Sequence, residues 1–395
     1  MVMTSSCPVC DSDSRWEPFI TFHDVPKTGV FPFSSSNPIG RQDLVFEYCP
    51  DCGLLRRHVP GIVSDPEYTD VNRSTAGQLP DYLAVLEEEV TSFFPDKTSL
   101  LVDVGGNDGT FVRRLCQNGY DNCLNVEPSL ELARRSRESG CQTLCAPLTH
   151  EVAARIVTEY GKAKILFLRH VLEHVANPVA MLRSIHGLLD EDGIFYLEFP
   201  DCRDIIEDGM AHELWEEHLY YFSPSTATAL LAKTGFVLSS QTILPHRAGH
   251  NILIRARKTR PSAKISSQSR VSKEISYFAQ HWNNYCAKLH QAASFWPRPI
   301  YMMGASHPQT NFIHFCGIQS LISQAVDDDS IKVGRFLNML PPVPIINTAK
   351  FKDTAIGGTL LLTAWGCDSW TSDLSAFALG KGMHVIAPYE IRSKA

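Results

Sequence analysis

The chain has 395 residues, of which 44% are hydrophobic, and these values suit two or three globular domains with ordinary cores. Its formal net charge of -7 argues against a nucleic-acid partner, because faces that bind phosphate backbones are normally basic. No secretory signal pattern follows Met1, and no apolar run is long enough to span a membrane. We therefore expect a cytoplasmic protein whose twelve cysteines are reduced thiols or metal ligands and do not form a disulfide framework.

Four cysteines near the N-terminus form two C-x-x-C motifs, Cys7 with Cys10 and Cys49 with Cys52. Two thiolates at this spacing chelate one ion from a tight turn, and two such turns complete a tetrahedral set of four sulfur ligands. We therefore predict a structural zinc site, which leaves no position for a catalytic water. The alternatives are free core cysteines and a redox pair, and the redox pair is disfavoured because neither motif follows a thioredoxin-like βαβ pattern.

The segment after the second motif contains Asp65-Pro66-Glu67-Tyr68. We expect Tyr68 either to project toward an active site or to be an ordinary, partly buried loop residue. A helical pattern over residues 82–94 then leads into the next domain.

An apolar stretch, residues 100–104, runs into a glycine-rich turn and then into a helical pattern that begins near Phe111. This order predicts a β-strand, a tight loop and a helix N-terminus, which together open a nucleotide site. About twenty residues on, a second apolar stretch ends where the next strand of a βαβ unit would place a carboxylate near ribose hydroxyls. The candidate cofactor-binding residues of this region are Asp103, Gly105, Asn107, Asp108, Gly109, Glu127 and Pro128.

The chemistry of this loop distinguishes between adenosine ligands. Its order is Gly105-Gly106-Asn107-Asp108-Gly109, which is not the G-x-G-x-x-G of dinucleotide sites, and the chain contains no Walker sequence. A carboxylate within the loop repels phosphate and suits a cationic ligand. We therefore predict S-adenosylmethionine (SAM), which carries ammonium and sulfonium charges, and the alternative is a glycine turn without a ligand.

From Leu100 to about Arg257, strand and helix patterns alternate, which predicts a doubly wound α/β sheet. A buried strand is expected at residues 165–168, and a helix that Asn177 caps follows the two histidines His170 and His174. Ligands of such sheets bind at the carboxyl ends of the strands, so we expect both histidines near the chemistry, His170 as a candidate cofactor-binding residue and His174 as a candidate catalytic residue. The alternative is that they only pack or cap at the strand end.

Acidic residues, histidines and aromatic residues alternate over residues 212–223, a composition that suits neither a surface helix nor an apolar core. A neighbouring carboxylate makes a histidine more basic and aromatic walls exclude water, so this stretch predicts a general base. The alternatives are a solvated acidic helix and a second zinc site made by His212, Glu213 and His218, whose spacing is not H-E-x-x-H. The candidate catalytic residues of this stretch are Glu217, His218 and Tyr221.

A basic, Ser-rich segment at 257–272 predicts a domain boundary, and strand patterns near 300, 325 and 360 repeat the α/β order on a smaller scale. We therefore predict an α/β protein of three domains. Residues 1–75 would form a small zinc-binding domain, residues 76–257 a Rossmann-like SAM-binding domain, and residues 258–395 a smaller α/β substrate-binding domain.

With these stretches, the chain resembles nearly end to end the three-domain, zinc-containing C-methyltransferases that act on nucleotide-linked keto-deoxysugars in antibiotic and surface-glycan pathways. The segments that carry the resemblance are the two C-x-x-C motifs, the loop that begins at Asp103, Val126-Glu127-Pro128-Ser129, Glu217-His218 with Tyr221-Phe222-Ser223, Cys316-Gly317-Ile318, and Val326-Asp327-Asp328-Asp329 with Gly334-Arg335.

The resemblance implies a central class I methyltransferase domain that holds SAM, and a nucleotide-sugar substrate between it and the C-terminal domain. It further implies His218 as the base, with Glu217 supporting it and His174 nearby. The predicted reaction is carbon methylation, in which the base removes a proton α to a ketone and the enolate attacks the SAM methyl group.

Three segments depart from the pattern of that family. Trp215 stands where the family has tyrosine. The family's Ala-rich turn, which contains a lysine, is Ala305–Gln309 in this chain, and its His-Gly-Gly-Ser segment is Arg247–His250. The last two lie where the substrate is expected, so O- or N-methylation of another small metabolite stays open. A non-catalytic zinc and SAM-binding module is a further alternative, as is a zinc-ribbon nucleic-acid protein, which the acidic charge disfavours.

Overall fold

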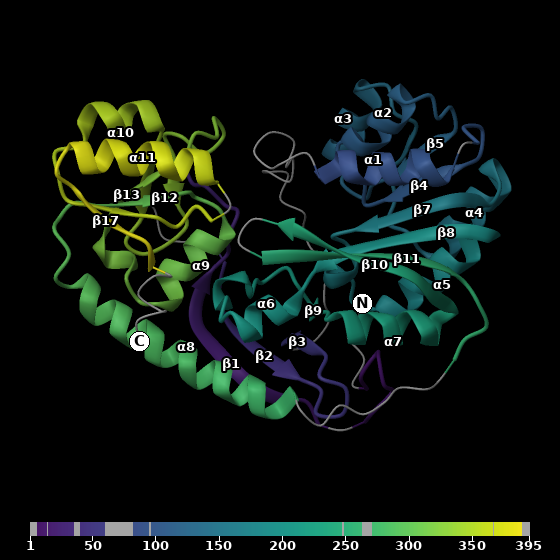
Figure 1. Cartoon of the computed structure of the whole chain (residues 1–395), viewed down its shortest axis with the longest axis horizontal. Coiled ribbons are helices and arrows are strands. Elements are labelled where there is room, and N and C mark those ends of the chain that lie inside the picture. Colours follow the sequence, from purple (N-terminus) through teal and green to yellow (C-terminus); the bar gives the residue numbers. More distant parts are fainter. Residues whose placement is uncertain are drawn as a thin grey trace. The chain divides into compact units, whose positions relative to one another are not determined.

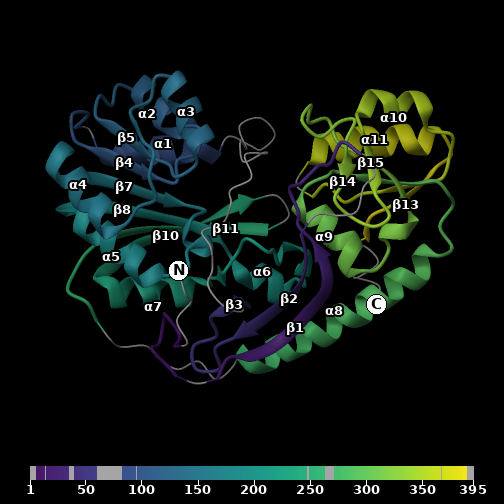
Figure 2. The same ribbon diagram turned by 180° about the vertical axis from the view of Figure 1, so that it is seen from behind.

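The computed structural model describes residues 6–13, 15–34, 40–59, 82–94, 96–246, 249–262, 271–365 and 367–388. By their contacts, the residues form two compact units, both drawn in Figure 1 and, from behind, in Figure 2. The first unit joins residues 1–17, 47–202 and 217–272, and the second joins residues 18–46, 203–216 and 273–395. This grouping differs from three consecutive domains, and the predicted boundaries near 75 and 257 stay a prediction.

The first unit is built on a seven-stranded sheet with the order β10-β11-β8-β7-β4-β5-β6. Strands β4 to β8 run parallel to one another, while β10 and β11 are antiparallel, so the predicted α/β sheet is confirmed. The strands are β4 (Leu101–Val104), β5 (Cys123–Val126), β6 (Thr143–Leu144), β7 (Ala163–Arg169), β8 (Leu189–Pro200), β10 (Phe236–His246) and β11 (Gly249–Lys258).

Side chains alternate between the two faces of this sheet along each strand, so both faces carry apolar side chains and both are covered by helices. Leu101 and Phe167 pack in the core that includes residues of α1 and α2, whereas Val102 and Leu166 pack in the core that includes residues of α4, α5 and α7 (Figure 1). The helices are α1 (Tyr82–Phe93), α2 (Thr110–Gln117), α3 (Leu130–Glu138), α4 (His150–Tyr160), the 3-10 turn η1 (Leu172–His174), α5 (Pro178–Leu188) and α7 (Pro224–Thr234).

Two short strands bring the histidine-rich stretch into the first unit. Strand β3 (Leu55–His58) pairs antiparallel with β9 (Tyr220–Tyr221), so that Leu55 lies opposite Tyr221. Helix α5 begins as predicted, because the Asn177 side chain accepts a hydrogen bond from the Ala180 backbone amide, and Pro178 occupies the first turn.

The second unit contains a six-stranded sheet with the order β14-β15-β13-β12-β16-β17, parallel except for β14. Residues of α10 and α11 pack with strand residues in one core on this sheet, as Figure 2 lets the reader follow. The strands are β12 (Ile300–Met303), β13 (Ile322–Val326), β14 (Phe336–Leu337), β15 (Val343–Ile346), β16 (Thr359–Leu361) and β17 (His384–Ile386). The helices are α9 (His307–Phe315), η3 (Gln319–Leu321), α10 (Thr348–Thr354) and α11 (Asp368–Gly380).

The remaining elements lie wholly or mainly in the second unit. They are β1 (Glu17–Pro26), β2 (Arg41–Tyr48), α6 (Cys202–Glu207), η2 (Ala211–Glu213) and the long helix α8 (Val271–Ala293). None of the helices within the described ranges combines the length and the apolar character that crossing a membrane requires.

Candidate active site

The glycine loop begins where β4 ends, and its backbone requires glycine at specific positions. Gly105 and Gly109 have φ of 72° and 75°, and Asn107 shares this left-handed region with φ of 55°. A Cβ on Gly105 would lie 2.4 Å from Val171 Cγ2. The loop therefore lies directly against the segment that follows β7.

Glu127 connects this loop to the end of β5. Its Oε2 accepts a hydrogen bond of 2.9 Å from the Asn107 amide, and its Oε1 accepts one of 2.9 Å from the Ser129 amide. The carboxylate is buried, and partly buried Pro128 follows it. Each carboxylate oxygen has a further lone-pair site, so these two bonds are compatible with the predicted contact to ribose hydroxyls.

The two aspartates of the loop region have structural partners. Asp103 is buried, and its Oδ2 accepts a hydrogen bond of 3.1 Å from Arg169, a strand-end cation that the sequence analysis did not single out. Burial raises the pKa of Asp103, and the Arg169 guanidinium opposes that rise. Asp108 Oδ1 accepts from the amide and the hydroxyl of Thr110 at 3.1 Å and 2.7 Å, which orders the first turn of α2.

His170 stands at the carboxyl end of β7 with φ of 52°, an uncommon conformation for a residue with a side chain. Its Nε2 lies 3.3 Å from Glu198 Oε1, and the Asn251 amide donates to the same oxygen at 2.9 Å. Burial opposes charge on His170, but Glu198 and Glu173 outweigh burial and raise its pKa. The predicted strand-end histidine, itself partly exposed, is thus paired with two buried acidic residues, Glu198 and Glu173, that sequence reasoning missed.

Two hydrogen bonds bring the histidine-rich stretch to η1. The Leu219 amide donates to the Glu173 carbonyl at 2.7 Å, and His174 Nδ1 donates to the Glu217 carbonyl at 2.9 Å. As a result, the rings of His174 and His218 meet edge to face with centroids 4.7 Å apart. The two histidines, 44 positions apart in the sequence, therefore lie side by side.

Other predicted residues surround this pair to different degrees. The Tyr221 ring, 5% exposed, has its centroid 5.6 Å from that of His218. Glu217 is buried, and it is its backbone oxygen that contacts His174. Glu173, which the sequence analysis did not select, completes a group in which one ligand atom from each of Glu173, His174 and His218 lies within 4.8 Å of the others. Tyr68 lies outside the described residues.

The stretch 212–223 is divided between the two units, since residues 212–216 belong to the second unit and residues 217–223 to the first. In the second unit, Glu213 lies between two imidazoles, 3.7 Å from His212 Nε2 and 3.8 Å from His307 Nε2. The Trp215 ring stacks on His307 with centroids 4.2 Å apart, and its Nε1 donates to Thr28 Oγ1 at 2.7 Å. Two of the three departures from the resembled family, Trp215 and the segment that contains His307, therefore contact each other.

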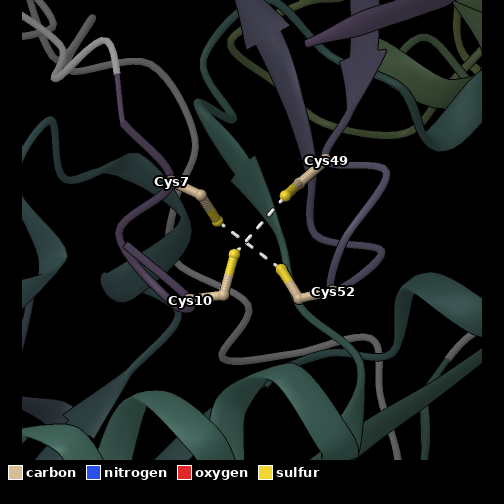
Figure 3. Close-up of side chains that lie close together, drawn as sticks. All are labelled: Cys7, Cys10, Cys49 and Cys52. Atoms are coloured by element: carbon tan, nitrogen blue, oxygen red, sulfur yellow. Dashed lines mark hydrogen bonds between the residues drawn. The ribbon is translucent and has the colours of Figure 1, made fainter. Parts of the chain in front are cut away.

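The four cysteines of the C-x-x-C motifs converge, as Figure 3 shows. Cys7 Sγ lies 3.5 Å from Cys52 Sγ, and Cys10 Sγ lies 3.6 Å from Cys49 Sγ. A tetrahedron of sulfurs at the usual zinc distance of about 2.3 Å has edges of about 3.8 Å, so the four atoms fit one metal ion.

The two cysteine turns have the same backbone construction. Asp11 and Gly53 have positive φ values of 57° and 77° and donate backbone hydrogen bonds to the carbonyls of Cys7 and Cys49 at 3.0 Å and 2.8 Å. Each turn directs its two sulfurs to one side. The repeated geometry supports the interpretation of these residues as a ligand set rather than as separate core thiols.

Comparisons with known proteins indicate a methyltransferase domain in this chain. The profile of a family described as "Methyltransferase domain" matches residues 77–241. The chain is 26% identical over 242 residues to the C-methyltransferase NovU of Streptomyces niveus, a match that spans 58% of this chain and 55% of NovU.

Solved structures similar to parts of the chain include the magnesium protoporphyrin IX methyltransferase of Synechocystis PCC 6803 with bound SAM. That match has 14% identity and a TM-score of 0.35, and it covers 45% of this chain and 78% of the other. A SAM-dependent methyltransferase from Mesorhizobium loti matches at 15% identity and a TM-score of 0.34, covering 45% of this chain and 100% of the other. TM-scores of this size do not by themselves establish a common fold.

The tight packing of Gly106 gives a first testable prediction. In Gly106→Ala, the new Cβ would lie 2.3 Å from Asn125 Oδ1 and 2.8 Å from Asp103 Oδ2, so we expect the free energy of unfolding to fall by about 1–3 kcal/mol. Gly187→Ala in α5 is the matched control, because nothing lies within 4 Å of its added Cβ. The control should gain up to about 1 kcal/mol from helix propensity. Urea titrations of both variants test this, and equal effects would contradict the packing argument.

Proposed function

We propose that the protein is a SAM-dependent methyltransferase that transfers the methyl group to carbon, at a position α to the ketone of a nucleotide-linked keto-deoxysugar. The observation that carries the proposal is the pair His174–His218 beside the loop-contacting segment at the end of β7. The likeness to NovU, whose name describes C-methylation, supports transfer to carbon. The nucleotide-sugar rests on the motif resemblance of the sequence.

In the proposed reaction, His218 takes the proton from the carbon next to the ketone, and the electron pair of that C–H bond becomes an enolate. The enolate carbon attacks the methyl group of SAM, the S–CH₃ bond breaks toward sulfur, and S-adenosylhomocysteine leaves. His174 and Tyr221 border the His218 ring and would restrict its orientation and its access to water. Glu217 would support the base from the same segment.

A second acceptor chemistry has one observation in its favour. In the second unit, the stacked Trp215–His307 pair replaces the tyrosine and the lysine-containing turn of the family. An altered polar surface at these positions favours a different small metabolite and, with it, O- or N-methylation. In that case the base would deprotonate a hydroxyl or would not be needed.

The experiment that separates these functions is hydrogen exchange. The protein is incubated in heavy water without SAM, with a panel of nucleotide-linked keto-deoxysugars, and the α position is followed by nuclear magnetic resonance. Carbon methylation through an enolate predicts deuterium uptake at the carbon that is methylated once SAM is added. Methyl transfer to oxygen or nitrogen without such uptake would overturn the proposal.

Replacing the base gives a prediction for turnover. His218→Ala should lower kcat by about 10²- to 10⁴-fold, the usual contribution of a positioned base, while SAM affinity stays near that of the wild type. His150→Ala, at an exposed position at the start of α4, is the control and should retain full turnover. Unchanged kcat in His218→Ala would remove this residue from the mechanism.

SAM binding would depend on Glu127 in two ways, because its carboxylate orders the loop and would meet the ribose hydroxyls. Glu127→Gln should weaken SAM binding by about 10- to 100-fold, since hydrogen bonds to a charged group contribute about 1.5–3 kcal/mol. Isothermal calorimetry measures this, with Glu138→Gln on the exposed side of α3 as the control. Wild-type affinity in Glu127→Gln would remove the ribose contact from the proposal.

We further propose that Cys7, Cys10, Cys49 and Cys52 hold one structural zinc ion. Cys10→Ser should then release about one zinc per chain and lower the thermal midpoint, because the binding free energy of a closed site contributes to folding. Cys116→Ser changes an exposed cysteine outside the cluster and should retain the metal. Elemental analysis of the purified variants measures both, and equal zinc in Cys10→Ser and wild type would contradict the site.

A further inference from the structure

Glu173 is a buried carboxylate beside the proposed base. The residue is 2% exposed, and neither of its carboxylate oxygens has a hydrogen-bond partner among the described residues. One of these oxygens and one ring nitrogen from each of His174 and His218 lie within 4.8 Å of one another. A buried charge without hydrogen bonds is costly, so local stability does not explain a carboxylate at this position.

The charge of Glu173 is only partly compensated by the cations that the structure records. Asp103 accepts a hydrogen bond of 3.1 Å from Arg169. Glu198 lies 3.3 Å from His170 Nε2. Glu173 shares His170 with Glu198, and its Oε1 is 3.6 Å from His170 Nδ1, beyond hydrogen-bond distance. Glu173 would therefore stabilise a positive charge that forms on another neighbouring imidazole.

The two imidazoles of His174 and His218 differ in exposure and in hydrogen bonding. His174 is 6% exposed, and its Nδ1 donates to the Glu217 carbonyl at 2.9 Å, which fixes its ring. The Leu219–Glu173 backbone hydrogen bond of 2.7 Å holds the segment of His218 against the turn that carries Glu173. His218 is only partly buried, so of the two rings it is the one that a substrate reaches more easily.

From this geometry we propose that Glu173 is the positioning residue of the base: it orients the His218 ring and stabilises the imidazolium that this ring becomes when it takes the α proton. The inference deepens the proposed function and rests on it for the identity of the base. A buried carboxylate has this task beside the histidine of a Ser-His-Asp triad, where it stays ionised. The distance from Glu173 to the ring exceeds a hydrogen bond, and such contacts often tighten when substrate binds.

The proton transfer needs no further reactant. The α C–H bond breaks, its electron pair stays on the substrate as the enolate, and the proton forms a new N–H bond on the His218 ring. The ring becomes a cation next to the Glu173 carboxylate, which thereby gains a close partner. After methyl transfer, the proton leaves His218 for water and the lone pair of the ring is restored. His218 thus remains the base of the proposed function.

The titration of His218 tests the pair without acceptor or SAM. Histidine ring signals of the ¹³C-labelled full chain are followed by nuclear magnetic resonance, and the signal that is missing in His218→Ala identifies this ring. The other titratable groups beside His218 are His174, Glu217 and Tyr221, which Glu173→Gln leaves in place. Because this variant removes the charge and keeps the shape, His218 should titrate about one pH unit lower than in the wild type. An unchanged midpoint would overturn the inference.

Glu198→Gln is the matched control, since Glu198 is also buried and its imidazole partner is His170. This variant should lower the midpoint of His170 more than that of His218, and the reverse order would overturn the pair. Circular dichroism shows whether each variant folds. If Glu173→Gln does not fold, the wild-type midpoint of His218 decides: a value above the ordinary one of about 6.5 supports the inference, and a value below it overturns the inference.

Turnover and stability should respond differently to Glu173→Gln. The variant loses a buried charge and no hydrogen bond, so its thermal midpoint should stay the same or rise. Its kcat should fall about tenfold with KM near that of the wild type, because a weaker base acts on the transition state. Glu173→Asp keeps the charge and should retain more turnover.

Two outcomes separate this inference from the proposed function. A lower thermal midpoint of Glu173→Gln together with an unchanged His218 titration would give Glu173 a structural role and overturn the inference alone. A lowered His218 midpoint in a protein that methylates only oxygen or nitrogen would support the pair and overturn the proposed carbon methylation.

Discussion

The position of β4 between β5 and β7 is the constraint on which the candidate site depends. In this parallel arrangement Val104 lies opposite Val126 on one side and Leu168 on the other, so the three strands end at the same level. The residues that follow each strand therefore meet at one edge of the sheet. The glycine loop, Glu127 and His170 are neighbours for this reason, although they are distant in the sequence.

Close packing at this edge links the predicted SAM loop to the candidate catalytic group. Gly105 leaves room for Val171, and two residues after Val171 comes Glu173. Because the loop and the turn η1 share this contact, the candidate cofactor loop and the candidate catalytic residues are positioned by one stretch of backbone. The left-handed φ of 52° at His170 turns the chain at that point and brings η1 over the strand ends.

The sequence was sufficient for features with local signals. The strand–loop–helix order near Asp103, the cap at Asn177 and the two C-x-x-C motifs each depend on neighbouring residues, and the structure has all of them. His174 and His218 were each singled out from their own stretch, but their proximity could be expected only through the family resemblance, because the contact depends on the long-range Leu219–Glu173 hydrogen bond.

Glu173 was missed for a related reason. In the sequence it is one acidic residue in the short connection between a strand and the helix that Asn177 caps, and acidic side chains are usually solvated. The sequence does not show that this residue is buried, because its burial depends on chain segments that are distant in the sequence. The division of residues 212–223 between two units was equally unpredictable, since composition alone does not tell where a polar and aromatic stretch changes from one core to another.

The four-cysteine cluster and the histidine pair of the first unit differ in chemistry in a way that would give them different tasks. Four thiolates are soft ligands that complete a tetrahedron, so under the proposed function the binding free energy of a metal there would hold the two turns together. The imidazoles of His174 and His218 lie beside a buried carboxylate, Glu173, at the strand ends. An imidazole without a metal keeps a nitrogen lone pair for a proton, so under the proposed function this group would serve the acceptor chemistry while the cysteine turns remain structural.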